Sequence, residues 1–309
     1  MSKIEKGEGR WESMVLIGII IAVVYWFLDS FLLLFISSDS YLFSGFLGEE
    51  TYEVLTRLIA LCLFIIFGSH VQYTINNRKK AEKALIESYK NLHNARITTI
   101  LGLAKLAESR DQATGSHLER MQQYSKLLAE ALAKNPKYNG YITADYIDSL
   151  YNSSVLHDIG KVGVPDSILL KPAKLNKNEF ELIKMHTTLG GDAIKAIESK
   201  IEGRSFLRIG KEVAYHHHEK WDGTGYPFGL KAEAIPLSAR IVALADHYDA
   251  LTSKRPYKEA LSHEKTVEII KREKGSHFDP DIVDAFLSLQ AEFNAVRAKM
   301  QTDNGHTVR

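Results

Sequence analysis

The feature that most constrains this chain is the apolar run at residues 14–36, MVLIGIIIAVVYWFLDSFLLLFI, which contains a single charged residue, Asp29. A helix of this length can cross a hydrocarbon layer about 30 Å thick. The run is also longer than the apolar segment of about 7–15 residues found in cleaved signal peptides. We therefore expect a transmembrane helix at 14–36 that stays in the mature protein.

A second run, residues 54–73, is less uniform because Arg57 and His70 flank its apolar centre. A buried core helix is the alternative interpretation. The chain needs a route back across the bilayer after the first span, which favours insertion, with Arg57 and His70 reaching towards opposite interfaces. In such a hairpin Asp29 and Arg57 lie towards the same end, and the cost of unpaired charge in a membrane predicts that they form an ion pair.

The distribution of basic residues predicts the orientation of this hairpin. The short external loop, residues 37–53, has no Lys or Arg, whereas Arg78, Lys79, Lys80 and Lys83 follow the second run. Basic residues concentrate on the cytoplasmic side of membrane proteins. We therefore expect a multi-pass protein of the cell (inner) membrane, embedded in the lipid bilayer, with residues 1–13 and the whole region after residue 73 in the cytoplasm.

Residues 74–108 form the linker to the rest of the chain. This segment is rich in helix-forming residues, lacks proline, and places Leu85, Leu92 and Thr99 at sevenfold spacing. A two-stranded coiled coil, and with it a homodimer, would give this pattern. A single amphipathic helix packed on the following domain would give it as well, and fewer than four heptads leave both interpretations open.

Overall composition excludes several classes of protein. The chain is 45% apolar and 25% charged, with a formal net charge of +1, which argues against a disordered chain and against a nucleic-acid polymer as partner. Its single cysteine, Cys62, excludes an internal disulfide framework and a cysteine-rich zinc module. Twelve histidines are therefore the more informative count.

Histidine and aspartate recur in patterns that suit metal ions. His157 and Asp158 are adjacent at the end of an apolar helical pattern that we expect Gly160 to end, three histidines stand at 216–218, and Asp246 lies in an apolar run. Each pattern has a plain alternative: a hydrogen-bonded core histidine, a solvated cluster, or a capping aspartate. Imidazole and carboxylate ligands without thiolate suit Fe, Mn, Zn or Mg, and a shared carboxylate is typical of hydrolytic two-metal centres.

Read in order, several stretches resemble the HD-GYP family of metal-dependent phosphohydrolases, a branch of the HD superfamily. The resemblance covers residues 110 to about 290. The stretches that carry it are RDQATGSHLER, LHDIGKVGVPDSILLKPAKL, EFELIKMHTTLGG, HHHEKWDGTGYPFGL, IPLSARIVALADHYDALTSKRPY and SHFDP.

The resemblance implies an all-α domain, expected at residues 109–298 with a flexible tail at 299–309, that hydrolyses cyclic di-GMP to pGpG or GMP. The metal ligands that it implies are His157, Asp158, His186, His217, His218 and Asp246. Asp158 would bridge two ions, and a hydroxide that the ions activate would attack phosphorus.

The resemblance also assigns substrate contacts. Lys161 would steady a phosphate oxygen, so it counts with Asp158 as a catalytic residue. The residues that would hold the dinucleotide are Lys161, Gly225, Tyr226, Arg255 and Lys258. Arginine suits this role because its planar group matches phosphate. A receptor that binds cyclic di-GMP with little turnover, or a phosphohydrolase acting on another nucleotide, are the alternatives.

One departure from the family pattern bears on the number of metals. Members with a third ion carry Glu four residues before the histidine equivalent to His117, and here that position is Ala113. We therefore expect two divalent ions, Fe or Mn ahead of Zn or Mg, with His117 a residual ligand or a supporting residue. His216 is expected outside the ligand set, and Asp249 is expected to support a ligand.

Overall fold

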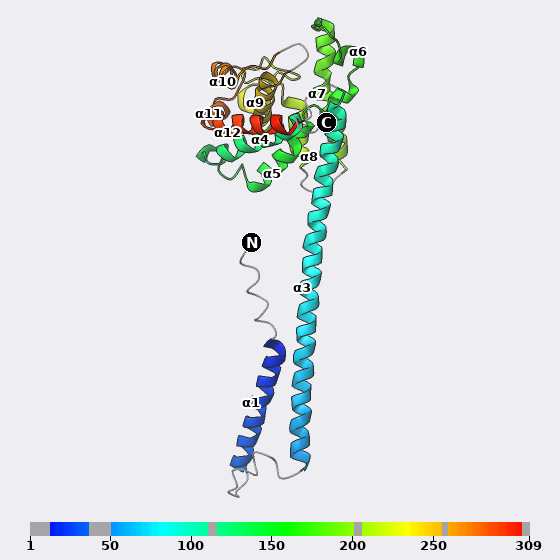
Figure 1. Ribbon diagram of the computed structural model, residues 1–309, viewed down its shortest axis with the longest axis vertical. Helices are drawn as coiled ribbons and strands as arrows, with labels where there is room; N and C mark the ends of the chain where they lie inside the picture. Colours follow the sequence, from blue (N-terminus) through cyan, green and yellow to red (C-terminus); the bar gives the residue numbers. More distant parts are fainter. Residues whose placement is uncertain (1–12, 37–50, 111–115, 201–205, 255–258, 305–309) are drawn as a thin grey trace. The chain divides into compact units, whose positions relative to one another are not determined.

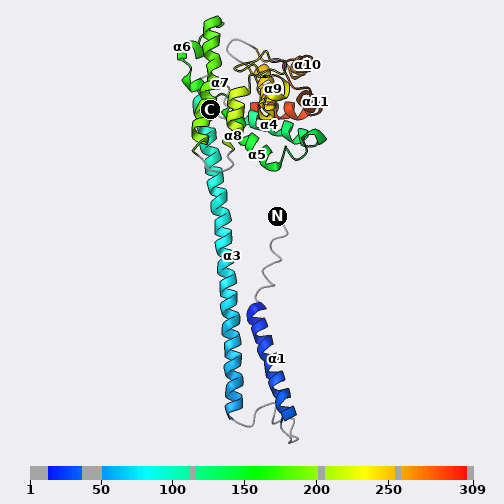
Figure 2. The same ribbon diagram turned by 180° about the vertical axis from the view of Figure 1, so that it is seen from behind.

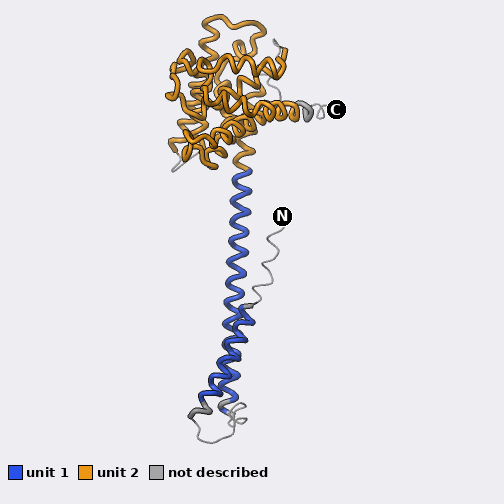
Figure 3. Tube along the Cα trace, turned by 90° about the vertical axis from the view of Figure 1, so that its left-hand side faces the viewer, with its two compact units in different colours: residues 1–94 blue, residues 95–309 orange. Residues whose placement is uncertain are grey.

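The computed structural model describes residues 13–36, 51–110, 116–200, 206–254 and 259–304. Within these ranges the regular structure is helical and contains no strand, which confirms the all-α expectation. The chain divides into two compact units, residues 1–94 and 95–309 (Figure 3).

The first unit contains α1 (Ser13–Ile36) and the N-terminal part of α3 (Thr51–Glu108). Both helices are long and apolar enough to cross a membrane. Arg57 Nε donates to Asp29 Oδ2 at 2.9 Å, and the Arg57 guanidinium lies 5.5 Å from the centre of the Trp26 ring. The Arg57 side chain is buried although it belongs to an apolar helix. The expected ion pair between the two apolar segments is therefore confirmed.

Helix α3 is continuous through the second apolar run and the linker, and the boundary between the two units falls inside it, after Asn94. Along the linker Leu85, Tyr89 and Leu92 are exposed. Nearer its end α3 contributes Ala104 to a small apolar cluster of the second unit. The C-terminal turns of α3 are therefore part of the second unit's fold.

Short connections and 3₁₀ turns join the helices of the second unit (Figure 1). Its α-helices are α4 (His117–Leu132), α5 (Ala144–Ser153), α6 (Asp166–Leu169), α7 (Lys177–Glu198), α8 (Leu207–His216), α9 (Leu237–Thr252), α10 (His263–Arg272), α11 (Pro280–Ser288) and α12 (Gln290–Asn304). Its 3₁₀ turns are η2 (Pro136–Tyr138), η3 (Ser154–Leu156), η4 (Ile159–Gly163) and η5 (Ala232–Ala234).

The main core forms around α9, which lies among the other helices of this unit in both views (Figures 1 and 2). Tyr248 of α9 is fully buried and packs edge-on against Tyr124 of α4 and Phe293 of α12. Tyr124 and Phe293 stack with ring centres 4.5 Å apart. This aromatic contact joins α4 and α12 beside the helix that carries Asp246.

The start of α11, near the end of the domain, agrees with the sequence prediction. Asp279 caps α11, accepting from the backbone N–H of Asp281 at 2.9 Å, and Pro280 opens the helix, as the sequence predicts. Helix α12 continues to Asn304, so the expected tail at 299–309 begins within this helix, and its flexibility stays a prediction. Near its end the carbonyl of Met300 accepts from Ser116 Oγ at 3.4 Å, which ties this turn to the start of α4. His306 lies outside the described residues.

Candidate metal centre

The His157–Asp158 pair lies in a tight non-α turn. Helix α5 ends at Ser153, and the chain continues through η3, the pair itself and η4. The expectation that one helix runs on to Gly160 is therefore wrong. Gly160 instead permits close packing, because a Cβ there would lie 1.9 Å from the carbonyl oxygen of His186. Only glycine lets this turn approach α7 so closely.

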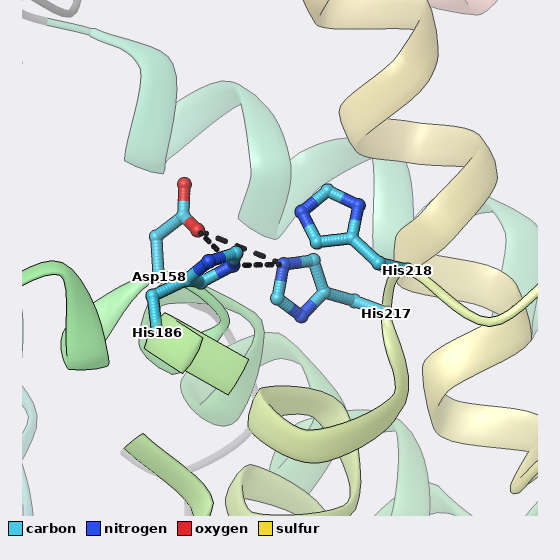
Figure 4. Close-up of side chains that lie close together, drawn as sticks. All are labelled: Asp158, His186, His217 and His218. Atoms are coloured by element: carbon cyan, nitrogen blue, oxygen red, sulfur yellow. Dashed lines mark hydrogen bonds and ion pairs between the residues drawn. The ribbon is translucent and has the colours of Figure 1, made fainter. Parts of the chain in front are cut away.

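On one side of Asp158 lie His186, His217 and His218, here called the imidazole-rich half (Figure 4). His186 projects from α7, whereas His217 and His218 directly follow α8. Asp158 Oδ1 is 3.3 Å from His186 Nε2 and 3.6 Å from His217 Nε2. Backbone carbonyls engage the opposite ring nitrogens of His186 and His217, at 2.6 and 3.0 Å, so both Nε2 atoms are aimed at the centre.

The other side of Asp158 is here called the carboxylate-rich half and contains Glu108, His117, His157 and Asp246. His157 Nε2 is 3.3 Å from Asp158 Oδ2 and 3.9 Å from Asp246 Oδ1. His117 Nε2 is 3.9 Å from the same Asp246 oxygen and 3.4 Å from Glu108 Oε1. The two oxygens of Asp158 thus face different groups of histidines.

The two halves shift the pKa values of their imidazoles in opposite directions. Burial lowers the pKa of His186 to about 4. Burial also disfavours the charged form of His157, but Asp158, Asp246 and Glu108 outweigh it and raise its pKa to about 9. Burial raises the pKa of the Glu108 carboxyl. The carboxylate-rich half is therefore the part of the centre that most favours positive charge.

Two buried atoms at the middle of the centre have no hydrogen-bond partner within the described ranges, His157 Nε2 and Asp158 Oδ1. An unsatisfied buried nitrogen and an unsatisfied carboxylate oxygen are costly unless another group binds them. Both atoms are good ligands for divalent metals. The residues present therefore fit a metal centre better than a hydrogen-bonded core.

Lys161 and Tyr226 lie beside the centre. Lys161 Nζ is 2.7 Å from Asp158 Oδ2, and with His157 it holds the pKa of the Asp158 carboxyl below its ordinary value, against the effect of burial. The Tyr226 ring stacks on His218 with ring centres 4.8 Å apart. One cationic and one aromatic side chain thus border the ligand groups.

Buried Glu219 organises the loop that carries Tyr226. Its carboxylate accepts from the backbone N–H groups of Phe228 at 2.8 Å and Leu230 at 3.1 Å. A Cβ on Gly225 would lie 2.3 Å from the backbone nitrogen of Lys220, so glycine is required where the loop folds back on itself. The loop is fixed by these contacts rather than by a regular helix.

Asp249 and Arg120 support His117 from behind. Asp249 accepts from His117 Nδ1 at 2.7 Å and from Arg120 Nε at 2.5 Å. These contacts outweigh burial and lower the pKa of Asp249 to about 2. A carboxylate on the far nitrogen of a ligand histidine fixes its orientation, so His117 Nε2 is held towards Glu108 and Asp246.

The structure brings together all six residues implied as ligands, and His117 lies beside them. His216 belongs to neither half and instead packs near Tyr215 and Phe228. Arg255, Lys258 and Ala113 lie outside the described residues. Sequence reasoning missed Glu108, Glu219 and Arg120. Glu108 stands just before the RDQATGSH motif, and its position there is the one signal that could have found it.

The family model and the relatives that match this chain agree on one family. Residues 102–282 match a family model described as HD domain. A cyclic di-GMP phosphodiesterase of Vibrio cholerae is 53% identical over 203 residues, which cover 66% of this chain and 41% of the relative. A probable cyclic di-GMP phosphodiesterase of the same organism is 44% identical over 236 residues, covering 76% of this chain and 53% of the relative.

A third relative from Vibrio cholerae, a 3'3'-cGAMP-specific phosphodiesterase 2, is 34% identical over 262 residues, covering 85% of this chain and 45% of the relative. The chain thus spans about half the length of the curated relatives that it matches.

Proposed function

The chain belongs to the HD-domain family, in its HD-GYP branch, and from this premise we propose that it is a metal-dependent phosphodiesterase that hydrolyses cyclic di-GMP to pGpG or GMP. The observation that carries the proposal is the position of the two Asp158 carboxylate oxygens. Oδ2 faces His157, whereas Oδ1 faces His186 and His217. A carboxylate placed in this way suits two neighbouring cations.

In this proposal the six residues named from the sequence hold two divalent ions, Fe or Mn in preference to Zn or Mg. The mixture of imidazole nitrogens and carboxylate oxygens supports these metals. When bound, such ions supply Lewis-acid polarisation of the phosphodiester and acidify water beside it. The protein's own contribution is to hold the ligands rigidly, through the backbone carbonyls behind His186 and His217 and through Asp249 behind His117.

Lys161 is proposed to stabilise the negative charge that develops on a non-bridging phosphate oxygen. Its ammonium group lies beside Asp158 and its side chain is partly exposed, so we expect a phosphate at the centre to reach it. Tyr226 and Gly225 are proposed to contact the dinucleotide, since the Tyr226 ring borders His218. Arg255 and Lys258 are proposed to bind its phosphates on the strength of the RPYK motif alone.

The test is hydrolysis of cyclic di-GMP by the full-length chain in detergent, with metal content measured on the same sample. We expect turnover with Mn²⁺ or Fe²⁺, and loss of both ions and of turnover in Asp158→Ala. Exposed Asp145 provides the matched control, Asp145→Ala, which should retain both. Binding without turnover, or unchanged hydrolysis by Asp158→Ala, would contradict the proposal. Parallel assays with 3'3'-cGAMP would reveal a different preferred cyclic dinucleotide.

We also propose that α1 and the N-terminal part of α3 span the inner membrane, with residues 1–13 and the second unit in the cytoplasm. The absence of Lys and Arg from residues 37–53 and the basic residues at 78–83 support this orientation. Reporter fusions after residue 45 and after residue 309 test it: the first should report the outside and the second the cytoplasm.

The linker is proposed to join two copies of the chain. Leu85, Tyr89 and Leu92 are exposed apolar residues on a helix that one chain leaves uncovered there, and a second copy of the same helix would bury them. Cross-linking between Leu85→Cys variants in membranes tests this contact. Lys90→Cys provides the comparison position. Absence of a cross-linked dimer from the Leu85→Cys variant would refute the contact.

A further inference from the structure

A second group of metal-ligating side chains lies outside the candidate metal centre. It consists of His247 on α9, Glu273 at the C-terminal cap of α10, and His277 in the connection between α10 and α11. Glu273 Oε2 is 3.0 Å from His277 Nδ1 and 3.7 Å from His247 Nε2. One carboxylate oxygen is therefore shared between two imidazoles that come from different parts of the fold.

The spacing of these atoms matches the spacing of ligands around one ion. Zinc bonds of about 2.0–2.2 Å in a tetrahedral site place neighbouring ligand atoms about 3.3–3.6 Å apart. The two distances to Glu273 lie on either side of that range, and all three ligand atoms lie within 4.8 Å of one another. The side chains need only small adjustments to close on a single cation.

The group is partly accessible to water, which can complete a ligand set of three side chains. The three side chains are between 22 and 29% exposed, so the group opens to solvent on one side. On the other side the His277 ring stacks on Phe278 with ring centres 4.1 Å apart, which restricts its orientation. His277 Nδ1 is within hydrogen-bond distance of Glu273 Oε2, so the imidazole and the carboxylate already converge on one point. Two imidazoles, one carboxylate and a water form a recurrent zinc ligand set.

We propose that His247, Glu273 and His277 bind a divalent transition-metal ion of the zinc type at a site separate from the candidate metal centre. Its role is structural. His247 follows Asp246 on α9, and successive helical side chains point about 100° apart, so α9 supplies a ligand to each site. The ion would fasten α9 to the connection between α10 and α11.

That connection in turn holds the segment after His218. The carbonyl of His277 accepts from the backbone N–H of Trp221 at 3.0 Å, and the carbonyl of Ser276 accepts from that of Asp222 at 2.9 Å. An ion on His277 would therefore stiffen the segment that leads from the imidazole-rich half into the loop of Tyr226. We expect its effect on stability to exceed its effect on turnover.

The experiment measures zinc bound per chain by mass spectrometry after dialysis of the full-length protein, for the natural chain and for His247→Gln and His277→Gln. His93→Gln, on α3, is the matched control. We expect each triad variant to bind one zinc ion fewer than the natural chain and the control. In a second measurement, zinc is added to the dialysed protein. We expect it to raise the melting temperature of the natural chain but not that of the triad variants.

The same measurement in an Asp158→Ala background separates the two sites. There the triad ion should remain although the candidate metal centre is disrupted, and adding His277→Gln should remove it. Glu273→Gln provides a second way to weaken the site if a histidine variant folds poorly. Equal zinc content in the natural chain and in all three triad variants would overturn the inference, whatever the outcome for hydrolysis.

Discussion

The two halves of the candidate metal centre use the same residue types in different proportions. The carboxylate-rich half sets His117 and His157 among Glu108, Asp246 and the shared Asp158, whereas the imidazole-rich half sets three histidines against Asp158 alone. The pKa of His157 is raised to about 9 and that of His186 is lowered to about 4. The same type of side chain therefore favours its charged form in one half and its neutral form in the other.

The supports behind the ligands differ in the same way. His186 and His217 are oriented by backbone carbonyls of their own helices, so local helix geometry is enough to aim them. His117 is oriented by Asp249, which also pairs with Arg120. The carboxylate-rich half therefore depends on buried charge, whereas the imidazole-rich half depends on helix geometry. A harder ion such as Mn²⁺ suits the first, and a borderline ion such as Fe²⁺ or Zn²⁺ is better tolerated by the second.

The strongest test of this division removes one histidine from each half. His157→Ala should remove the ion of the carboxylate-rich half and His186→Ala that of the imidazole-rich half, each leaving the other ion bound. Turnover should fall about a thousandfold or more in both, because two-metal hydrolysis loses several kcal/mol of charge stabilisation with either ion. Metal content and kcat measured on the same samples check this. Loss of both ions from either variant would mean that the halves are not separate sites.

The next largest effect is expected on the free energy of unfolding, when the buried charge of Asp249 behind His117 is removed. Asp249→Asn leaves Arg120 buried without its carboxylate, and breaking such a pair costs about 3–5 kcal/mol in the free energy of unfolding. Denaturant unfolding of the purified chain measures the loss. The double variant with Arg120→Met should lose less than the sum of the single changes. Simple additivity would show that the pair is not coupled.

Glu108 should matter to one half only. Glu108→Gln removes a carboxylate 3.4 Å from His117 Nε2, and we expect metal affinity in the carboxylate-rich half to fall about 10- to 100-fold, the range typical of groups that support a metal site. Metal titration followed by calorimetry gives this value. Exposed Glu130 on α4 supplies the control, Glu130→Gln, and an equal loss in both variants would remove Glu108 from the centre.

The smallest effect is expected from the ring that borders the imidazole-rich half. Tyr226→Leu should lower kcat/KM by about tenfold or less, because an aromatic contact contributes about 0.5–1.5 kcal/mol beyond its buried area. Tyr226→Phe keeps the ring and should behave nearly as the natural chain does. If Tyr226→Phe is as impaired as Tyr226→Leu, the hydroxyl rather than the stacked ring makes the contact.

Several features could be predicted because local sequence carries their physical cause. The apolar runs predicted α1 and the start of α3, the charges within them predicted the Asp29–Arg57 pair, and Asp279 with Pro280 predicted the start of α11. The histidine and aspartate patterns indicated a metal site, because few other residue types bind hard and borderline divalent ions, whereas the six-residue ligand set came from the resemblance to the HD-GYP family. The prediction that a helix runs on to Gly160 was wrong, because Gly160 permits close packing against α7 and does not end a helix.

The sequence by itself determined which side chains can ligate a metal and which segments are apolar enough for a membrane, since both follow from residue chemistry and short-range spacing. Tertiary structure alone decided that Glu108 faces His117, that Arg120 and Asp249 stand behind it, and that Glu273 lies between His247 and His277. Glu273 and His247 are 26 positions apart, with the whole of α10 between them, and Arg120 and Asp249 are more than a hundred positions apart. Such pairs form only when packing of the core brings their helices together, because no local periodicity links their positions.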